Sequence, residues 1–212
     1  MIPSPQTILA LGPHPDDIEL GCGGSLARFE EGGSNIHIRV FSECSKSIPA
    51  GFVTADLVRE CQEAATVLGA SSCEVLKLPV RELPTHRQAV LEEMVKLNRL
   101  LQPDLVLVPS SGDFHQDHQV VYAEAVRAFR TCTVLGYEVA WSNRGHQPTL
   151  FIKLTDEQVN KKVEALRCYR TQVVAGRAYF KNDEMFRAPL RVRGSQVREL
   201  YAEGFEVILS VW

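Results

Sequence analysis

Two short polar motifs in this sequence place histidines beside carboxylates. They are HPDD at residues 14–17 and HQDH at residues 115–118. Imidazole nitrogens and carboxylate oxygens are donors for zinc and related divalent cations. In the first motif, a turn can aim His14 and Asp17 at one point, while Asp16 points elsewhere and can hold a water molecule that the metal polarises. The first motif therefore contains the donors of a metal site.

The second motif has two histidines three positions apart, so His115 and His118 can face the same site. Asp117 lies between them, close enough to orient an imidazole from behind. Taken alone, each motif has an ordinary explanation of about equal weight, either a helix-capping aspartate beside a histidine or a solvated polar loop. Their joint occurrence after two predicted strands favours a metal site.

Short β-rich runs alternate with longer amphipathic stretches along the chain. The predicted strands are residues 7–11, 36–41, 74–78, 105–108, 133–139, 150–154 and 206–211. The predicted helices are residues 20–31, 56–68, 87–101, 119–130 and 156–170. This alternation predicts an α/β fold, a single Rossmann-like domain over residues 1–212 with a mostly parallel sheet and helices on both faces.

Such sheets place their active sites at the carboxyl ends of the strands, where both polar motifs fall. Residues 173–199 show no clear period, and we expect a long loop or small lid there.

The composition is that of a globular protein, with 45% hydrophobic and 23% charged residues, which excludes a disordered chain. A net charge of −3 gives no electrostatic basis for binding nucleic acid or an anionic membrane. No apolar run approaches the roughly 20 residues that a bilayer requires. Residues 1–5 lack the pattern of a secretion signal, and the six scattered cysteines indicate reduced thiols that fill the core. We therefore expect a cytoplasmic protein.

The two motifs together carry a family resemblance. HPDD, followed by Glu19 and the glycine-rich GCGG at residues 21–24, and then HQDH, is similar to the PIG-L/LmbE-like zinc-dependent N-deacetylases. Those enzymes remove acetyl groups from N-acetylated amino sugars and their conjugates. Supporting segments are RECQEA at residues 59–64, YRTQ at 169–172 and the tail at 193–206. The segment at 42–45 departs from the family pattern, so the resemblance assigns no substrate role to Glu43.

The resemblance implies one zinc ion per chain, although iron(II), cobalt or manganese would accept the same donors. The implied protein ligands are His14, Asp17 and His118. Three protein ligands leave coordination positions open, which favours a catalytic over a closed structural site.

Catalytic and substrate roles follow from the same resemblance. Asp16 is implied as the general base, and His115 as the group that stabilises or protonates the tetrahedral intermediate. Asp117 would orient His115 or its neighbour. Two interpretations of Arg59 have equal weight. It is either a surface residue, or it holds a sugar hydroxyl or supports an active-site carboxylate. Arg81 has less support for such a role.

The resulting prediction is an N-deacetylase whose partner is a small N-acetylated sugar or glycoconjugate, with a homo-oligomer left open. Two alternatives remain, a metal hydrolase of a non-sugar amide or ester, and a non-catalytic sugar- or nucleotide-binding module.

Other conspicuous residues have structural explanations that we favour. GCGG fails the dinucleotide pattern and indicates close helix packing. The pair at 161–162 is expected on a solvated helix face. Trp141 and Tyr137 could form a platform for a sugar ring, but core packing is the preferred reading. The remaining histidines are expected to be solvated or hydrogen-bonded rather than ligands, namely His37, His86 and His146.

Overall fold

The computed structural model describes residues 5–211 of the chain. Residues 1–4, on which the expectation of no secretion signal largely rests, and Trp212 lie outside the described part. The strands are β1 (Thr7–Gly12), β2 (Asn35–Val40), β3 (Ser72–Val75), β4 (Leu105–Pro109), β5 (Thr133–Tyr137), β6 (Leu150–Lys153) and β7 (Ala202–Leu209). The helices are α1 (Asp17–Glu31), α2 (Thr54–Val67), α3 (Arg87–Leu101), α4 (Gln116–Ala128), α5 (Asp156–Arg167), α6 (Arg170–Val174) and α7 (Glu184–Gln196).

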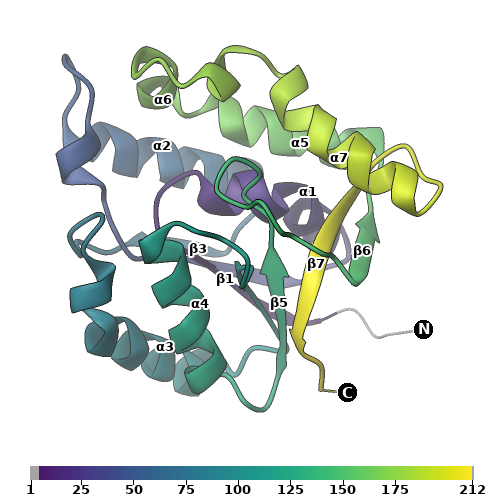
Figure 1. Ribbon diagram of the computed structural model, residues 1–212, viewed down its shortest axis with the longest axis horizontal. Helices are drawn as coiled ribbons and strands as arrows, with labels where there is room; N and C mark the ends of the chain where they lie inside the picture. The colour runs from purple at the N-terminus through teal and green to yellow at the C-terminus, as the bar shows by residue number, and fades with distance from the viewer. Residues whose placement is uncertain (1–4, 212) are drawn as a thin grey trace.

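The strands form one sheet in the order β3-β2-β1-β4-β5-β7-β6. Strands β1 to β5 run parallel, while β7 is antiparallel to both β5 and β6. Helices α3 and α4 cover one face, and α1, α2 and α5 cover the other (Figure 1). The prediction of a mostly parallel sheet between two helical layers is confirmed. No helix in the described range 5–211 combines the length and apolarity needed to cross a membrane.

Strand β1 is buried on both faces, which explains why its sequence is apolar throughout. Ile8 and Ala10 pack into the core on the α1 side, whereas Leu9 and Leu11 pack into the core on the α3 side. A parallel strand covered on both faces is expected to be continuously apolar. The central position of β1 in the sheet is therefore encoded in its composition.

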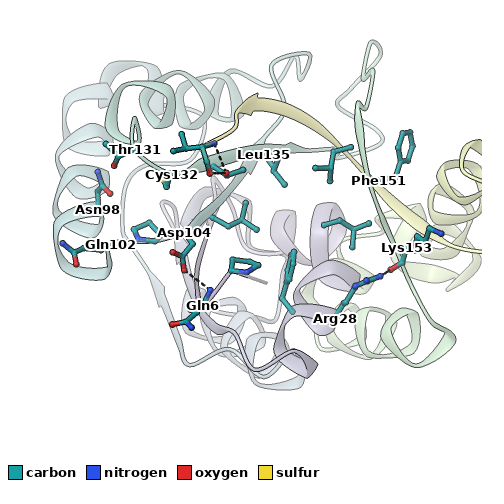
Figure 2. Close-up of a pocket in the computed structure, with 18 of the residues that line it drawn as sticks. Gln6, Arg28, Asn98, Gln102, Asp104, Thr131, Cys132, Leu135, Phe151 and Lys153 are labelled. Carbon is teal, nitrogen blue, oxygen red and sulfur yellow. Dashed lines mark hydrogen bonds between the residues drawn. The ribbon is translucent and has the colours of Figure 1, made fainter. Parts of the chain in front are cut away.

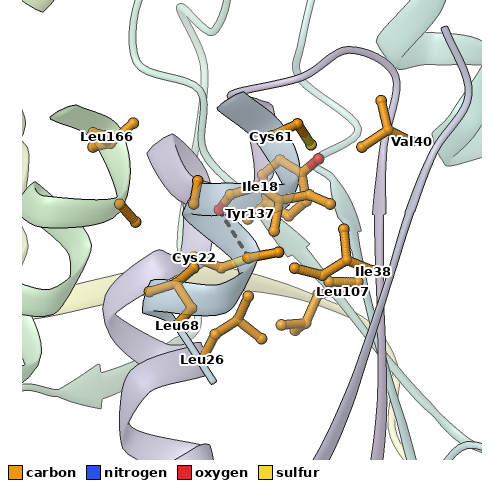
Figure 3. Packing of buried hydrophobic residues seen from close by; sticks show 14 of the residues in the cluster. Ile18, Cys22, Leu26, Ile38, Val40, Cys61, Leu68, Leu107, Tyr137 and Leu166 are labelled. Atoms are coloured by element: carbon orange, nitrogen blue, oxygen red, sulfur yellow. Dashed lines mark hydrogen bonds between the residues drawn. The ribbon is translucent and has the colours of Figure 1, made fainter. Parts of the chain in front are cut away.

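Helix α1 packs very closely on the sheet. Its residues Ile18, Cys22 and Leu26 recur every four positions and face β2 and β4 (Figure 3). A Cβ atom at Gly21 would lie 2.1 Å from the ring of Tyr137, which only glycine can avoid. This close approach explains the glycine-rich segment and supports the packing interpretation over a dinucleotide site. Tyr137 itself is a core residue, with its hydroxyl donating to the carbonyl of Leu11.

Of the two expectations for residues 173–199, the long loop is wrong, whereas the small lid stays a prediction. Helix α7 occupies Glu184–Gln196, and a short 3₁₀ helix occupies Ala178–Lys181. The buried side of α7 is only a narrow stripe of Phe186, Leu190 and Gly194, and Pro189 lies inside the helix. Both features weaken the helical pattern in the sequence, because proline normally interrupts a helix.

The expectation that both lysines at 161–162 are solvated is also wrong. Lys162 is 2% exposed, and its ammonium group lies 2.6 Å from Glu203 Oε1 and 2.7 Å from the carbonyl oxygen of Leu20. Lys161 is half-buried and pairs with Glu30. Sequence alone could not distinguish the two, because the partner of Lys162 comes from the distant strand β7.

Candidate metal centre

The two polar motifs meet at the carboxyl ends of adjacent strands. β1 ends at Gly12 and β4 at Pro109, and these strands pair directly in the sheet. The chain continues from β1 into α1 on one face and from β4 into α4 on the other. Adjacent strands whose helices leave to opposite faces form the crevice in which open α/β sheets bind ligands. The topology therefore brings HPDD and HQDH together.

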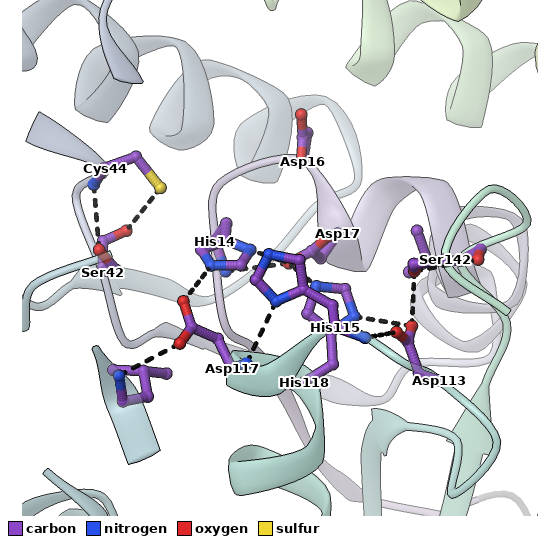
Figure 4. A network of polar contacts seen from close by, with 12 residues as sticks. His14, Asp16, Asp17, Ser42, Cys44, Asp113, His115, Asp117, His118 and Ser142 are labelled. Carbon is purple, nitrogen blue, oxygen red and sulfur yellow. Dashed lines mark hydrogen bonds and ion pairs between the residues drawn. The ribbon is translucent and has the colours of Figure 1, made fainter. Parts of the chain in front are cut away.

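Three donors converge in this crevice (Figure 4). Asp17 Oδ2 lies 3.1 Å from His14 Nδ1 and 3.2 Å from His118 Nε2. One donor atom from each of these residues lies within 4.8 Å of the others. Two imidazole nitrogens and a carboxylate oxygen at this spacing fit one divalent cation, and three protein donors leave room in its coordination sphere.

Each of the two imidazoles is held from behind by a second carboxylate. Asp117 Oδ2 lies 2.8 Å from His14 Nε2, and Asp113 Oδ2 lies 2.8 Å from His118 Nδ1. Metal-binding histidines usually donate their other N–H to a carboxylate, which fixes the ring and its tautomer. This arrangement, with both far nitrogens engaged, is the strongest indication that His14, Asp17 and His118 fit a metal ion.

Asp117 is itself fixed by the chain. It accepts hydrogen bonds from the backbone N–H groups of Arg81 and Leu83, at 2.6 and 3.1 Å. Its carboxylate contacts His14 rather than His115, and its backbone N–H donates to His115 Nδ1. Arg81 stands at a φ of 68°, and it contributes to the site through its backbone.

Asp113 is a residue of the site that the sequence analysis missed. Its Oδ2 accepts from the Ser142 hydroxyl at 2.7 Å, and its Oδ1 accepts from the backbone N–H of His115 at 2.9 Å. A carboxylate two residues before the HxDH motif, in the same loop, was the signal that could have identified it.

His115 caps the amino end of α4. Its Nδ1 accepts a hydrogen bond from the backbone N–H of Asp117 at 3.1 Å, so in the neutral ring the proton must be on Nε2. Burial, together with repulsion from His14 and His118, lowers its pKa, which favours this neutral form. Its ring centre lies 4.9 Å from that of His14 and 4.7 Å from that of His118. His115 therefore carries its N–H donor close to His14 and His118.

Asp16 occupies the position before α1 in a left-handed conformation, with φ of 89°. Its side chain leaves the loop in a direction different from that of Asp17 (Figure 4). In the described part of the chain, its carboxylate has no hydrogen-bond donor or ion-pair partner. Burial, and then repulsion from Asp17 and Glu19, raises its pKa well above the usual range, so the group has an increased affinity for protons.

The cluster of His14, Asp17 and His118 favours positive charge. Burial opposes ionisation of Asp17, but His118 and His14 outweigh it and hold the pKa of this carboxyl below its usual range. Burial likewise opposes charge on His118, yet Asp17 and Asp113 raise its pKa to about 10. The carboxylates thus create a local field suited to a cation.

The remaining predicted residue, Arg59, lies on an exposed face of α2. Its guanidinium pairs with Asp56 at 2.7 Å and with Glu63 at 3.8 Å. Its neighbour Glu60 is buried and accepts from the backbone and hydroxyl of Thr171. A substrate role for Arg59 stays a prediction.

A separate cavity of about 1100 Å³ lies at the amino ends of the strands, opposite the crevice (Figure 2). Its lining includes Gln6, Asp104 and Thr133, at the amino ends of β1, β4 and β5. The Asp104 carboxylate accepts from the backbone N–H groups of Gln6 and Thr7. None of the predicted site residues lines this cavity.

Comparison with known proteins gives a consistent family. The model of the PIG-L family, described as GlcNAc-PI de-N-acetylase, matches residues 9–129, which include both polar motifs. The chain is 32% identical over 172 residues to the uncharacterized deacetylase YaiS of Escherichia coli (strain K12), covering 77% of this chain and 90% of that protein. It is 24% identical over 235 residues to the diacetylchitobiose deacetylase of Thermococcus kodakarensis, covering 98% of this chain and 85% of that one.

Solved structures with a similar fold include a deacetylase. The N,N'-diacetylchitobiose deacetylase from Pyrococcus horikoshii matches this structure with a TM-score of 0.81 at 20% identity, over 96% of this chain and 84% of that chain. This match shows a shared fold, while the family match covers more than half of the chain and contains the whole ligand set. The protein therefore belongs to the PIG-L, or GlcNAc-PI de-N-acetylase, family.

Proposed function

We propose that this protein is a zinc-dependent N-deacetylase that removes the acetyl group from an N-acetylated amino sugar or glycoconjugate. The observation that carries the proposal is the His14, Asp17 and His118 cluster, in which each histidine is held by its own carboxylate. Family membership and the deacetylases among the relatives support the reaction and an acetylated sugar as substrate.

The ligand set would hold one divalent cation per chain, with zinc favoured by two imidazoles and one carboxylate. When bound, such a cation would supply polarisation of the amide carbonyl and would lower the pKa of the attacking water towards about 7. The chain must then hold the acetamide in the crevice, accept a proton from water and return one to the leaving nitrogen.

Asp16 is the group best suited to carry the proton. Its raised pKa and its carboxylate, which has no donor among the described residues, allow it to take a proton from water and pass it to the amine. His115 directs its Nε2–H toward the region beside the ligands, where it can donate to the carbonyl oxygen as negative charge develops. The products are acetate and a free amine.

We also propose where the protein acts and what it binds. We propose a cytoplasmic location, which the six free cysteines support. The partner is a small N-acetylated molecule, and a homo-oligomer remains compatible with this site.

The test is acetate release from a panel of N-acetyl sugars, nucleotide sugars and glycosides, with simple N-acetyl amides and acetyl esters included. We expect turnover only with acetamido sugars. Asp16→Asn should abolish most turnover while retaining the metal, and His118→Ala should lose the metal. Asp104→Asn, beside the cavity at the amino ends of the strands, is the matched control. Wild-type turnover by Asp16→Asn would refute the assignment of the base, and preference for esters or simple amides would refute the substrate class.

A further inference from the structure

Two of the six cysteines lie side by side. The sulfur of Cys61, on α2, lies 3.8 Å from the sulfur of Cys73, on β3. Both are free thiols in this structure. Two cysteines can form a disulfide without a large backbone movement only where the fold already brings them close together. The pair therefore has the first requirement of a reversible oxidation site.

A tight turn between α2 and β3 fixes this contact. Gly69 stands at a φ of 72°, and the backbone N–H of Ala70 donates to the carbonyl of Ala65 at 2.9 Å. Glycine adopts this left-handed conformation without strain, and it ends many helices in this way. The turn reverses the chain, so that Cys73 on the strand lies against the side of the helix that carries Cys61.

The two thiols differ in their access to solvent. Cys61 is fully buried in the cluster that α1, α2 and the sheet share (Figure 3). Cys73 is half-buried on β3, which is an edge strand of the sheet, and its neighbours Ser72 and Glu74 are exposed. A small molecule in solution therefore meets Cys73 first. The contact with Cys73, and then burial, raise the pKa of the Cys61 thiol well above its usual value, which makes Cys61 the slower nucleophile.

The same turn of α2 contacts the segment that holds the proposed base. Glu60 directly precedes Cys61, and its carboxylate accepts from the backbone N–H and the hydroxyl of Thr171, the latter at 2.6 Å. The Cys61 thiol also interacts with the Tyr169 hydroxyl. That hydroxyl accepts from the backbone N–H of Asp16 at 3.0 Å. A displacement of Cys61 would therefore be passed through Tyr169 to the backbone of Asp16.

We propose that a low-molecular-weight disulfide oxidises Cys61 and Cys73 to a reversible disulfide, and that this bond lowers turnover. The Cys73 thiolate attacks one sulfur of the small disulfide and releases one small thiol. Cys61 then attacks the Cys73 sulfur and releases the second small thiol. The two protein thiols lose two electrons, which reduce the small disulfide, and their two protons pass to the released thiols.

The effect on turnover follows from the distance between the sulfurs. A covalent bond requires them to approach much more closely than 3.8 Å. Cys61 must then leave its place beside Tyr169, or α2 must shift and carry Glu60 with it. Either movement would loosen the contacts that hold the backbone of Asp16. This effect rests on the proposed function, whereas the oxidation site itself does not.

Mass spectrometry tests the oxidation site directly. The metal-loaded protein is treated with oxidised glutathione, alkylated and cleaved after glutamate, which separates the two cysteines at Glu63. We expect a disulfide that joins peptides 61–63 and 64–74 and that dithiothreitol reverses. Cys168→Ser, which removes another half-buried thiol, should form the same link, and Cys73→Ser should not. Absence of the link in the wild type, or a glutathione adduct that persists on Cys73, would overturn the proposal.

Turnover tests the coupling to the base. The oxidised wild type should have a kcat about three- to tenfold lower than the reduced protein, because small displacements of catalytic groups have effects of this size. KM and metal content should change little, and dithiothreitol should restore kcat. Oxidised glutathione should leave the kcat of Cys73→Ser unchanged. A linked protein with undiminished kcat would overturn the coupling.

The two measurements also separate this inference from the proposed function. If no form of the protein releases acetate from any sugar, the proposed function is refuted, and with it the effect on turnover. The mass spectrum still decides whether Cys61 and Cys73 form the disulfide.

Discussion

The backbone N–H of Asp16 donates to the phenolic oxygen of Tyr169, 3.0 Å away. Asp16 stands at a φ of 89°, a conformation that destabilises a non-glycine residue by about 1–3 kcal/mol unless its surroundings hold it. Tyr169 is fully buried between α5 and α6, far from Asp16 in the sequence. The tyrosine therefore fixes the backbone that carries the proposed base.

Tyr169→Phe removes the phenolic oxygen but keeps the ring. The N–H of Asp16 would lose its acceptor, and the backbone that carries the carboxylate would be held less firmly. We expect kcat to fall about ten- to a hundredfold, because small displacements of catalytic groups have effects of this size. KM and metal content should change little. Steady-state kinetics and metal analysis of the purified variant measure these three quantities.

Tyr137→Phe is the matched control for that change. Tyr137 is equally buried, and its hydroxyl donates to the Leu11 carbonyl at 2.9 Å. Its loss should lower stability without a comparable loss of kcat. If both variants lose kcat in proportion to their loss of stability, Tyr169 has only a structural role.

Asp113→Asn tests the carboxylate behind His118. The substitution removes the negative charge that holds the His118 ring, at 2.8 Å from Nδ1, while it preserves shape. Loss of such partners typically weakens metal binding ten- to a hundredfold, and we expect a loss in this range. Competition with a fluorescent chelator measures the dissociation constant. Asp104→Asn should bind metal as the wild type does, and an unchanged affinity in Asp113→Asn would contradict the assignment.

The sequence predicts those features that depend on local pattern. Helix α3 lies where the apolar spacing places it, and the strand at Leu105–Pro109 is recognisable because both of its faces are buried. The convergence of the two motifs followed from a general rule on strand ends. Lys162 could not be assigned in this way, because its partner Glu203 lies on a distant strand. Asp113 had a local signal, its place two residues before the second motif, but its contact with Ser142 is not visible in the sequence.

Glu19 should make the free energy of unfolding depend on pH. The side chain is 1% exposed, and one of its carboxylate oxygens has no partner among the described residues. Burial raises its pKa to about 7, from 4.5 in the unfolded chain. Between these values the native state binds the proton more tightly, so the free energy of unfolding falls as pH rises, by on the order of 3 kcal/mol.

Glu19→Gln removes this titration. Urea unfolding of the metal-saturated proteins at a series of pH values from 5 to 8 measures the difference in stability between the wild type and the variant. The wild type should lose stability relative to the variant as pH rises through this range, and the difference should level off above the folded-state pKa. Parallel stability profiles for the two proteins would show that Glu19 does not titrate as its burial implies.

The buried pair of Lys162 and Glu203 supports an irregular turn of α1. The helix departs from helical geometry at Cys22, and Glu203 accepts hydrogen bonds from the N–H groups of Gly24 and Ser25, at 3.0 and 2.7 Å. The Lys162 ammonium balances this carboxylate at 2.6 Å. A buried carboxylate with its cation removed is strongly unfavourable.

Lys162→Met should therefore lower the free energy of unfolding by about 3–5 kcal/mol. The double variant with Glu203→Gln should recover part of the loss, because no uncompensated charge then remains. Lys161→Met is the matched control on the same helix. Its pair with Glu30 is solvent-exposed in part, so its loss should change stability by less than about 1 kcal/mol. Denaturant unfolding of the wild type and these three variants measures the losses, and equal losses from the two lysine variants would show that the burial of Lys162 has no energetic consequence.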